Sequence, residues 1–373
     1  MALALFAFLG VITDQFSQSL NEFEIAGTLM TGFALLAASS FLLISALYAY
    51  KGMRGELLEI KLLNRIQNVF RKRRGWFLLG SLATGGLVSN ADFGLFALAP
   101  IHSWAVIAIF LFTFFMAADG ILHVSKQRFW GVLTSGMFLA PLAAIPLEIA
   151  AGLLGLFALI AYIGSQAAYS GLFGQLSDFQ GLLNNQGELF DTLNPLADDP
   201  IVFGIALFFI AFLVPIIEEL LKPIGLYLSL GRNWTPANGF ALGALSGAGF
   251  ALFENLTLAI ASTQWLPVMI ARIGTSSMHI LTSGIFGWAI VRAKLTKRYW
   301  LAFWGFAISV LLHGLWNGLT IATSFSSLIN EDSARLSFSP SLTNGMLFGL
   351  LILGLGSIFL LRFNRKQLLA SKE

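Results

Sequence analysis

Residues 201–230 read IVFGIALFFIAFLVPIIEELLKPIGLYLSL, an apolar run in which only Glu218, Glu219 and Lys222 are charged. About 20 apolar residues in a helix are enough to cross the hydrocarbon core of a bilayer. The run is continuous rather than alternating, which disfavours a membrane β-barrel. The stretch therefore predicts a membrane-spanning helix that carries a small cluster of charges.

The composition of the whole chain agrees with this prediction. Of its 373 residues, 57% are hydrophobic and 11% are charged, and 35 are Phe. Ordinary soluble domains contain roughly 25% charged residues, so this chain has too little polar surface for a soluble enzyme, a disordered protein or a nucleic-acid-binding domain. There is no Cys, which excludes disulfides, thiolate metal sites and cysteine nucleophiles.

Eight further windows have the length and apolarity of membrane spans. They are 25–50, 76–98, 101–122, 129–164, 237–262, 268–291, 300–323 and 342–362. The sequence thus predicts an all-α polytopic membrane protein with about nine transmembrane helices and an active site buried in the bundle. The window 129–164 is too long for one straight span, and its Pro141, Pro146 and Glu148 predict a kink or an additional interfacial piece.

Three regions are expected along the chain. They are an N-terminal transmembrane region 1–200, a catalytic four-helix core 201–323, and a last span with a basic tail 324–373. Residues 1–13 are apolar without a preceding basic residue, which indicates an interfacial or poorly ordered start rather than a secretory signal. The outer loop 165–200 has apolar residues at helical spacing and is either a connector or a lid that guides substrate.

Basic residues predict the orientation of the spans. Of the 22 Lys and Arg residues, 19 fall on one side of the predicted membrane, which places the N-terminus outside and the C-terminus in the cytoplasm. The segment 51–75 holds eight of them. We interpret it as a juxtamembrane helix facing anionic lipid headgroups, and we expect no nucleic-acid partner.

Ionisable side chains inside spans are costly and are usually functional. They gather on four successive predicted spans: Glu218, Glu219 and Lys222 on the first, Glu254 on the second, Arg272 and His279 on the third, and His313 with Asn317 on the fourth. Helix geometry places them at a similar depth near the bilayer centre. Asp92, Asp119 and Glu148 are isolated and are expected to line the bundle or an interface.

The chemistry of these groups suits the activation of water. Glu218 and Lys222 are four residues apart and can pair, and a single cation neutralises one of two adjacent carboxylates, which leaves the other suited to act as a general base. Histidine can relay a proton, and an Asn amide can stabilise an oxyanion. The small residues Gly239, Gly243 and Gly247 are expected to press Glu254 towards the helix of Glu218, with dimerisation as the alternative.

Four motifs, taken together, resemble one family of membrane proteins. They are Glu218-Glu219-x-x-Lys222, the run GFALFEN at 249–255, Arg272 with His279, and HGLWN at 313–317. In order, spacing and placement they resemble the PrsW family, relatives of the type II CAAX prenyl endopeptidases and bacteriocin-processing membrane proteins. The resemblance covers about residues 200–320. Signatures of rhomboid, presenilin and site-2 proteases are absent.

The resemblance implies an intramembrane endopeptidase that cuts membrane-anchored proteins, such as an anti-sigma factor, in a prokaryotic plasma membrane. It implies that Glu218 or Glu219 is the base, that Glu254 and His279 complete the water site, and that His313 and Asn317 stabilise the tetrahedral intermediate, with Lys222 and Arg272 in support. A glutamic mechanism needs no cofactor. The alternatives are a zinc protease with Glu218, Glu254, His279 and His313 as ligands, and a proton-coupled transporter.

Overall fold

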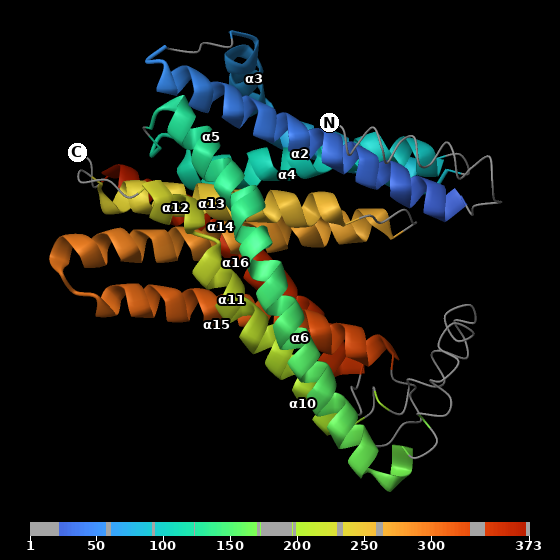
Figure 1. The fold of residues 1–373 in the computed structure, drawn as a ribbon. Coiled ribbons are helices and arrows are strands. Elements are labelled where there is room, and N and C mark those ends of the chain that lie inside the picture. The colour runs from blue at the N-terminus through green and yellow to red at the C-terminus, as the bar shows by residue number, and fades with distance from the viewer. Residues whose placement is uncertain are drawn as a thin grey trace. The chain divides into compact units, whose positions relative to one another are not determined.

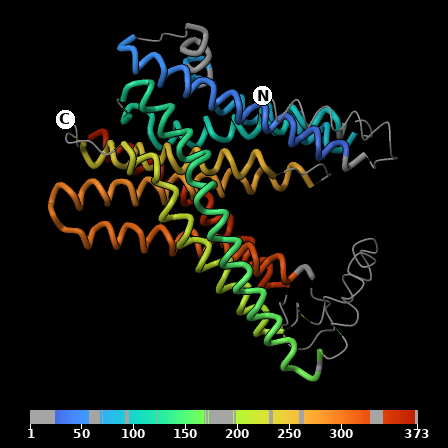
Figure 2. Tube along the Cα trace, viewed as in Figure 1, coloured from blue at the N-terminus to red at the C-terminus, as the bar shows by residue number. Residues whose placement is uncertain are grey.

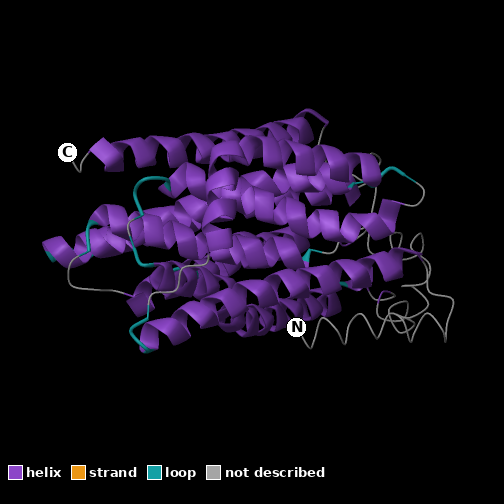
Figure 3. Cartoon of the chain, turned by 90° about the horizontal axis from the view of Figure 1, so that it is seen from above, coloured by secondary structure: helices purple, strands orange, loops and turns teal. Residues whose placement is uncertain are grey.

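The chain forms helices throughout the part that the structure describes. In a computed structural model, the described residues are 22–56, 61–91, 94–122, 124–169, 172, 196, 199–229, 234–258, 264–328 and 340–370, and they contain no strand (Figure 3). The predicted all-α class is confirmed. The predictions for residues 1–13 and for most of the loop 165–200 lie outside the described residues.

The helices follow the predicted windows in order (Figure 1). They are α2 (Glu22–Met53), α3 (Lys61–Val88), α4 (Gly94–Ala118), α5 (Lys126–Thr134), α6 (Ala140–Ser165), α10 (Pro200–Leu207), α11 (Val214–Leu221), α12 (Ile224–Ser229), α13 (Pro236–Thr257), α14 (Trp265–Thr296), α15 (Trp300–Leu328) and α16 (Pro340–Ala370). Within the described residues, six helical segments are long and apolar enough to cross a membrane, and α3, α13 and α14 are not among them. The predicted number of nine spans is therefore not confirmed.

Two of the long segments contain a π-helical turn. The first, η1 (Ser135–Leu139), joins α5 to α6, where the sequence predicted a kink. The second, η3 (Phe208–Leu213), joins α10 to α11 just before Pro215. Proline lacks the backbone N–H that a regular helix would use and crowds the preceding turn, and a π turn is one way in which a helix accommodates such a break.

The chain forms two compact units, each made of separate stretches. Unit 1 contains Met1–Leu142, Leu221–Ser309 and Gly354–Glu373, and unit 2 contains Ala143–Leu220 and Val310–Leu353. The main hydrophobic core lies in unit 1 and is built largely from α2, α4, α13 and α14. The predicted regions 1–200, 201–323 and 324–373 stay a prediction.

In unit 1, α13 and α14 run side by side in opposite directions (Figures 1 and 2). Their backbones touch along the glycine row: a Cβ at Gly239 would lie 2.6 Å from the carbonyl oxygen of Gly287, and one at Gly243 would lie 2.2 Å from that of Ser283. The prediction that the row packs within the chain is confirmed. The partner that we predicted was wrong, because the row faces α14 rather than the helix of Glu218. Small residues on α13 allow the backbone of α14 to approach closely, which explains why the row packs against α14.

In unit 2, Asp199 caps the N-terminus of α10. Its Oδ1 accepts from the backbone N–H groups of Ile201 (2.8 Å) and Val202 (3.3 Å). Its Oδ2 accepts from the hydroxyls of Tyr169 (2.7 Å) and Tyr162 (2.9 Å). Burial raises the pKa of this carboxyl, but donation from the two tyrosines and the two amides outweighs burial and lowers the pKa below its usual value. The carboxylate therefore ties the end of α6 and the turn after it to the start of α10.

The Asp199→Asn protein is expected to be less stable than the wild type at neutral pH. The free energy of unfolding should fall by about 1–3 kcal/mol, because two tyrosine hydroxyls and two amides lose a charged acceptor. The loss should be constant above about pH 4, the unfolded-state pKa of Asp. It should shrink as the pH falls through the lower pKa of the folded carboxyl, where the wild type also loses its charge. Thermal unfolding of both proteins in detergent between neutral and acidic pH measures this, and a loss independent of pH would contradict it.

Candidate active site

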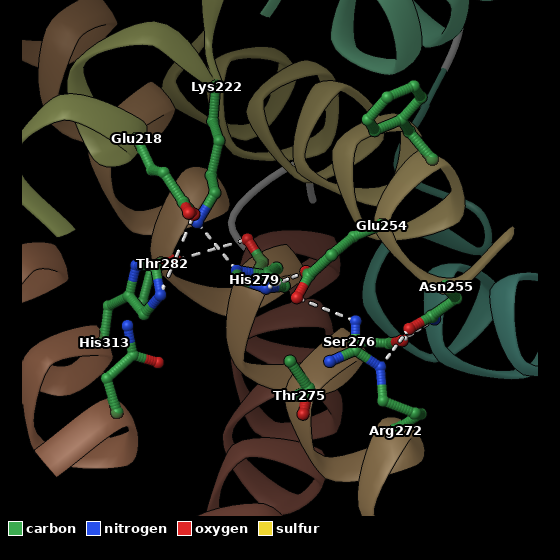
Figure 4. A network of polar contacts seen from close by, with 12 residues as sticks. Glu218, Lys222, Glu254, Asn255, Arg272, Thr275, Ser276, His279, Thr282 and His313 are labelled. Atoms are coloured by element: carbon green, nitrogen blue, oxygen red, sulfur yellow. Dashed lines mark hydrogen bonds and ion pairs between the residues drawn. The ribbon is translucent and has the colours of Figure 1, made fainter. Parts of the chain in front are cut away.

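In unit 1, His279 lies between Lys222 and Glu254 (Figure 4). Its Nδ1 is 2.7 Å from Nζ of Lys222, and its Nε2 is 2.8 Å from Oε2 of Glu254. The side chains of Lys222 and His279 are buried. A lysine ammonium can only donate hydrogen bonds, so Nδ1 accepts and Nε2–H donates to the carboxylate. The partners thus select one neutral tautomer of His279 and make it a hydrogen-bond donor.

The second oxygen of Glu254 is held by Arg272. Nη2 of Arg272 lies 2.8 Å from Oε1 of Glu254, and Nε donates to Oδ1 of Asn255. The Asn255 amide donates in turn to Oγ of Ser276 at 2.9 Å. His279 thus contacts one oxygen of the Glu254 carboxylate and Arg272 contacts the other. Charge-assisted hydrogen bonds are strong and directional, so together they fix the orientation of the carboxylate. It remains partly accessible, with 38% of its side chain exposed.

Sequence reasoning assigned no role to two residues that enclose Lys222. The ammonium lies 4.7 Å from the centroid of the Phe250 ring, a cation–π contact, and Oγ of Ser246 donates to the backbone carbonyl of Lys222. Ser246, Phe250 and Glu254 follow one another at intervals of four, so they share one face of α13. That spacing is the signal that could have identified both residues.

In unit 2, His313 lies between Glu218 and Glu219. Its Nδ1 is 2.9 Å from Oε1 of Glu219, and its Nε2 is 3.8 Å from Oε2 of Glu218, as the figure of the polar network shows for the latter contact (Figure 4). The Glu219 side chain is fully buried, and 14% of the Glu218 side chain is exposed. An ionised carboxylate only accepts, so Nδ1–H donates to Glu219. When the ring is neutral, its Nε2 carries a lone pair on the side of Glu218.

The π turn η3 allows α15 to come close enough for this contact. A Cβ at Gly314 would lie 2.3 Å from the carbonyl oxygen of Ala211, so only glycine fits at the crossing. The amide of Asn317 donates to the carbonyl of Ile210 at 3.0 Å. Asn317 thus braces the turn with one of its two amide hydrogens.

Asp119, predicted to be isolated, is in fact an ion-pair centre. Its carboxylate lies 2.6 Å from Arg71, 3.4 Å from Arg74 and 4.0 Å from Arg365. It therefore joins the basic segment at the start of α3 to the basic C-terminal helix. Glu148 lies on α6, and Asp92 lies outside the described residues. The predicted pairing of Lys222 with a neighbouring glutamate stays a prediction.

Comparison with known protein families decides the relationship. The model of the PrsW family, described as PrsW family intramembrane metalloprotease, matches residues 181–342. Through this segment the chain is similar to the PrsW family. The chain matched no curated protein and no solved structure. The PrsW match supports an intramembrane protease, and it contains every predicted site residue: Glu218, Glu219, Lys222, Glu254, Arg272, His279, His313 and Asn317.

The PrsW family is described as intramembrane metalloproteases. Whether a metal ion fits this chain depends on which donor atoms its side chains can offer. A histidine ligand must direct a lone pair on nitrogen at the metal. In unit 1, both nitrogens of His279 contact protein atoms, and the lone pair on Nδ1 is taken by the ammonium of Lys222. In unit 2, His313 and Glu218 offer two donors, and Glu219 holds the other nitrogen of the ring. A catalytic zinc uses three protein ligands, so the donors of one unit alone do not complete such a site.

Proposed function

We propose that the chain is a glutamic-type intramembrane endopeptidase that hydrolyses peptide bonds of membrane-anchored proteins. The observation that carries this proposal is the position of His313 between two carboxylates in unit 2, one hydrogen-bonded to Nδ1 and the other opposite Nε2. A buried histidine held by a carboxylate and directed at a second one is suited to general acid–base work on water. The PrsW match supplies the independent support for proteolysis.

The two adjacent glutamates have different proposed roles. Glu219 is fully buried and its Oε1 is hydrogen-bonded to His313, so we assign it the task of fixing the tautomer and orientation of the ring, as the acidic member of a catalytic triad does. Glu218 is partly exposed and its Oε2 stands 3.8 Å from Nε2. A water molecule between them can donate one hydrogen to each, which makes Glu218 the proposed base.

The reaction then balances with water as the only co-reactant. Glu218 removes a proton from water, and the water oxygen forms a bond to the carbonyl carbon of the peptide. The tetrahedral intermediate collapses with cleavage of the C–N bond, and the proton on Glu218 passes to the leaving nitrogen. His313 accepts a hydrogen bond from the water, and the second amide hydrogen of Asn317 is the proposed donor to the oxyanion.

The cluster in unit 1 is proposed to serve the same reaction. His279 is held as a donor, and Glu254 is fixed by Arg272, so these groups present a rigid arrangement of charge with Lys222 as its buried cation. Preorganised charge of this kind stabilises charge that develops in a transition state without reorganisation. Neutralising Glu254 or removing His279 is therefore proposed to impair cleavage.

The proposed setting of the enzyme combines the distribution of its charges with its resemblance to the PrsW family. We propose a prokaryotic plasma membrane with the N-terminus outside and the C-terminus in the cytoplasm, anionic lipids at the basic face, and a single-span regulator such as an anti-sigma factor as substrate. The distribution of 19 of 22 basic residues supports this orientation.

Cleavage in a defined membrane tests the proposed function. The purified chain is placed in liposomes with a panel of single-span reporter proteins, and mass spectrometry identifies the new termini. We expect at least one reporter to be cut within or next to its span by the wild type and not by the Glu218→Gln protein. Cleavage that is equal in both would be due to a contaminant and would refute the assignment.

Metal chelation should leave this activity unchanged. The glutamic mechanism uses only side chains, so we expect cleavage to persist after dialysis against EDTA and 1,10-phenanthroline. Elemental analysis of the active protein should show less than one zinc per chain. Loss of activity on chelation, restored by added zinc but not by magnesium, would instead establish the zinc-dependent alternative.

A further inference from the structure

His102 is a buried polar residue in unit 1 that the proposed mechanism does not use. It lies on α4, is 1% exposed, and precedes the matched segment 181–342 by about eighty residues of sequence. A polar ring in an apolar interior is costly unless its nitrogens find partners. Both nitrogens of His102 do so.

The partners of His102 select one tautomer. Nε1 of Trp265 lies 3.2 Å from Nδ1 of His102, and the backbone carbonyl oxygen of Asn255 lies 3.0 Å from Nε2. The indole nitrogen can only donate and the carbonyl can only accept. His102 therefore accepts at Nδ1 and donates from Nε2–H. It links the indole of Trp265 to the backbone carbonyl of Asn255.

The carbonyl that His102 contacts is one that a helix cannot satisfy by itself. The last four carbonyls of an α-helix have no partner within the helix, and Asn255 falls within the last four residues of α13, which ends at Thr257. The neighbouring carbonyls of Phe253 and Glu254 accept from the Thr257 hydroxyl at 3.1 Å. His102 thus acts as a cap from another helix, at the residue next to Glu254.

Asn255 connects this cap to the charged cluster. Its side chain accepts from Arg272 and donates to Ser276, and Arg272 pairs with Glu254 at 2.8 Å. A shift of the Asn255 backbone would therefore move both the residue that carries the carboxylate and the side chain that fixes its cation. Glu254 is the hydrogen-bond partner of His279.

Trp265, the donor to His102, is itself held rigidly. It is fully buried, and its ring fills the space left by Gly85 on α3, where a Cβ would lie 2.1 Å from the indole. The rings of Trp265 and His102 meet edge to face, with centroids 6.5 Å apart. α3, α4 and α14 together thus fix the donor.

We propose that His102 is a positioning residue for Glu254, acting through the Asn255 carbonyl and Arg272 in a tautomer set by Trp265. This inference rests on the proposed function, because a positioning role requires a reaction. If His102 positions Glu254, then α4, which precedes the matched segment 181–342, takes a direct part in the geometry of the site. His102 itself belongs to none of the four motifs.

Three variants separate this role from simple packing. His102→Leu removes the donor and the acceptor together. His102→Gln retains both, because its amide nitrogen can donate to Asn255 and its oxygen can accept from Trp265. Trp265→Phe removes only the indole N–H.

With the cleavable reporter in liposomes, we expect kcat of His102→Leu to fall by about 10- to 100-fold, as for a small displacement of a catalytic group. KM should be unchanged, His102→Gln should regain most of the activity, and Trp265→Phe should lie between.

Each outcome decides something different. If the wild type cuts the reporter and His102→Leu matches it in kcat, or if folded His102→Gln is as slow as His102→Leu, the positioning role is wrong and the proposed function stands. If the wild type cuts no reporter, the proposed function falls and the role of His102 falls with it. Elution as a single species in detergent confirms that each compared variant is folded.

A spectroscopic measurement tests the same contact without activity. The chain has four histidines, so a ¹⁵N-histidine spectrum of the full-length protein contains few signals, and the one missing from His102→Gln belongs to His102. We expect its Nε2 to be protonated and its Nδ1 to be unprotonated, and we expect Trp265→Phe to shift the Nδ1 resonance. A signal with the proton on Nδ1 would overturn the proposal.

Discussion

Replacement of Glu218 by glutamine is expected to lower kcat for cleavage by about 10²- to 10⁴-fold, the range that a general base contributes. The amide keeps the size of the side chain but cannot take a proton from water. The carboxylate lies opposite Nε2 of His313, so KM should change little, because the step that is lost is chemical rather than binding. Initial rates with the reporter in liposomes, at several reporter densities, measure both quantities.

A second glutamate provides the matched control for this experiment. Glu56 follows α2, contacts Lys51 and is 45% exposed, so Glu56→Gln makes the same chemical change at a glutamate with a different partner. We expect it to retain the wild-type kcat. If Glu218→Gln were as active as Glu56→Gln, Glu218 could not be the base, and a strong loss in Glu219→Gln alone would transfer that role to its neighbour.

Substitution of Gly314 by alanine is expected to reduce kcat by about 100-fold, the effect of moving a catalytic group by about 1 Å. The new methyl group would lie 2.3 Å from the carbonyl oxygen of Ala211, which is backbone and cannot rotate away. α15 must therefore move away from the π turn, and His313, the preceding residue, moves with it. The 2.9 Å contact between His313 and Glu219 is the part of the site that should be lost first.

Gly318 offers the control one turn further along α15. A Cβ there would meet the Cβ of Ala211 at 3.5 Å, which is ordinary packing distance. Gly318→Ala should thus keep both kcat and thermal stability close to the wild-type values. Equal activity of the two alanine variants would show that the close approach at Gly314 is not needed for catalysis.

The fold class could be predicted from sequence, whereas the details of the helices could not. Continuous apolar runs are a direct consequence of helices in lipid. The predicted windows follow the helices in order, although 76–98 crosses from α3 into α4 and 201–230 contains α10, α11 and α12. The glycine row was recognised but assigned to the wrong partner, since small residues indicate a close approach and not the neighbour that makes it. The π turn before Pro215 could not be predicted, because a proline indicates a bend and not the form of turn that makes it.

The candidate site shows the same division. Costly ionisable groups on successive apolar helices identified Glu254 and His279 as candidate site residues, and the structure places them 2.8 Å apart. The sequence could not show which nitrogen of His279 donates, because that depends on the ammonium of Lys222. It also gave no reason to select His102, because a single histidine on an apolar helix has no motif, and its partners Trp265 and Asn255 are more than 150 residues away.

The enclosure of α13 has a consequence for how such an enzyme can diversify. Seventeen of its 22 residues are buried, with the glycine row against α14 and Gly249 against the carbonyl of Leu133 on α5. A helix surrounded in this way has few positions at which substitutions accumulate neutrally, because a Cβ added at one of these glycines meets backbone. The carboxylate of Glu254 is thus carried by the least adaptable helix of its unit. Adaptation to new substrates is left to helices with open sides, such as α10 and α15.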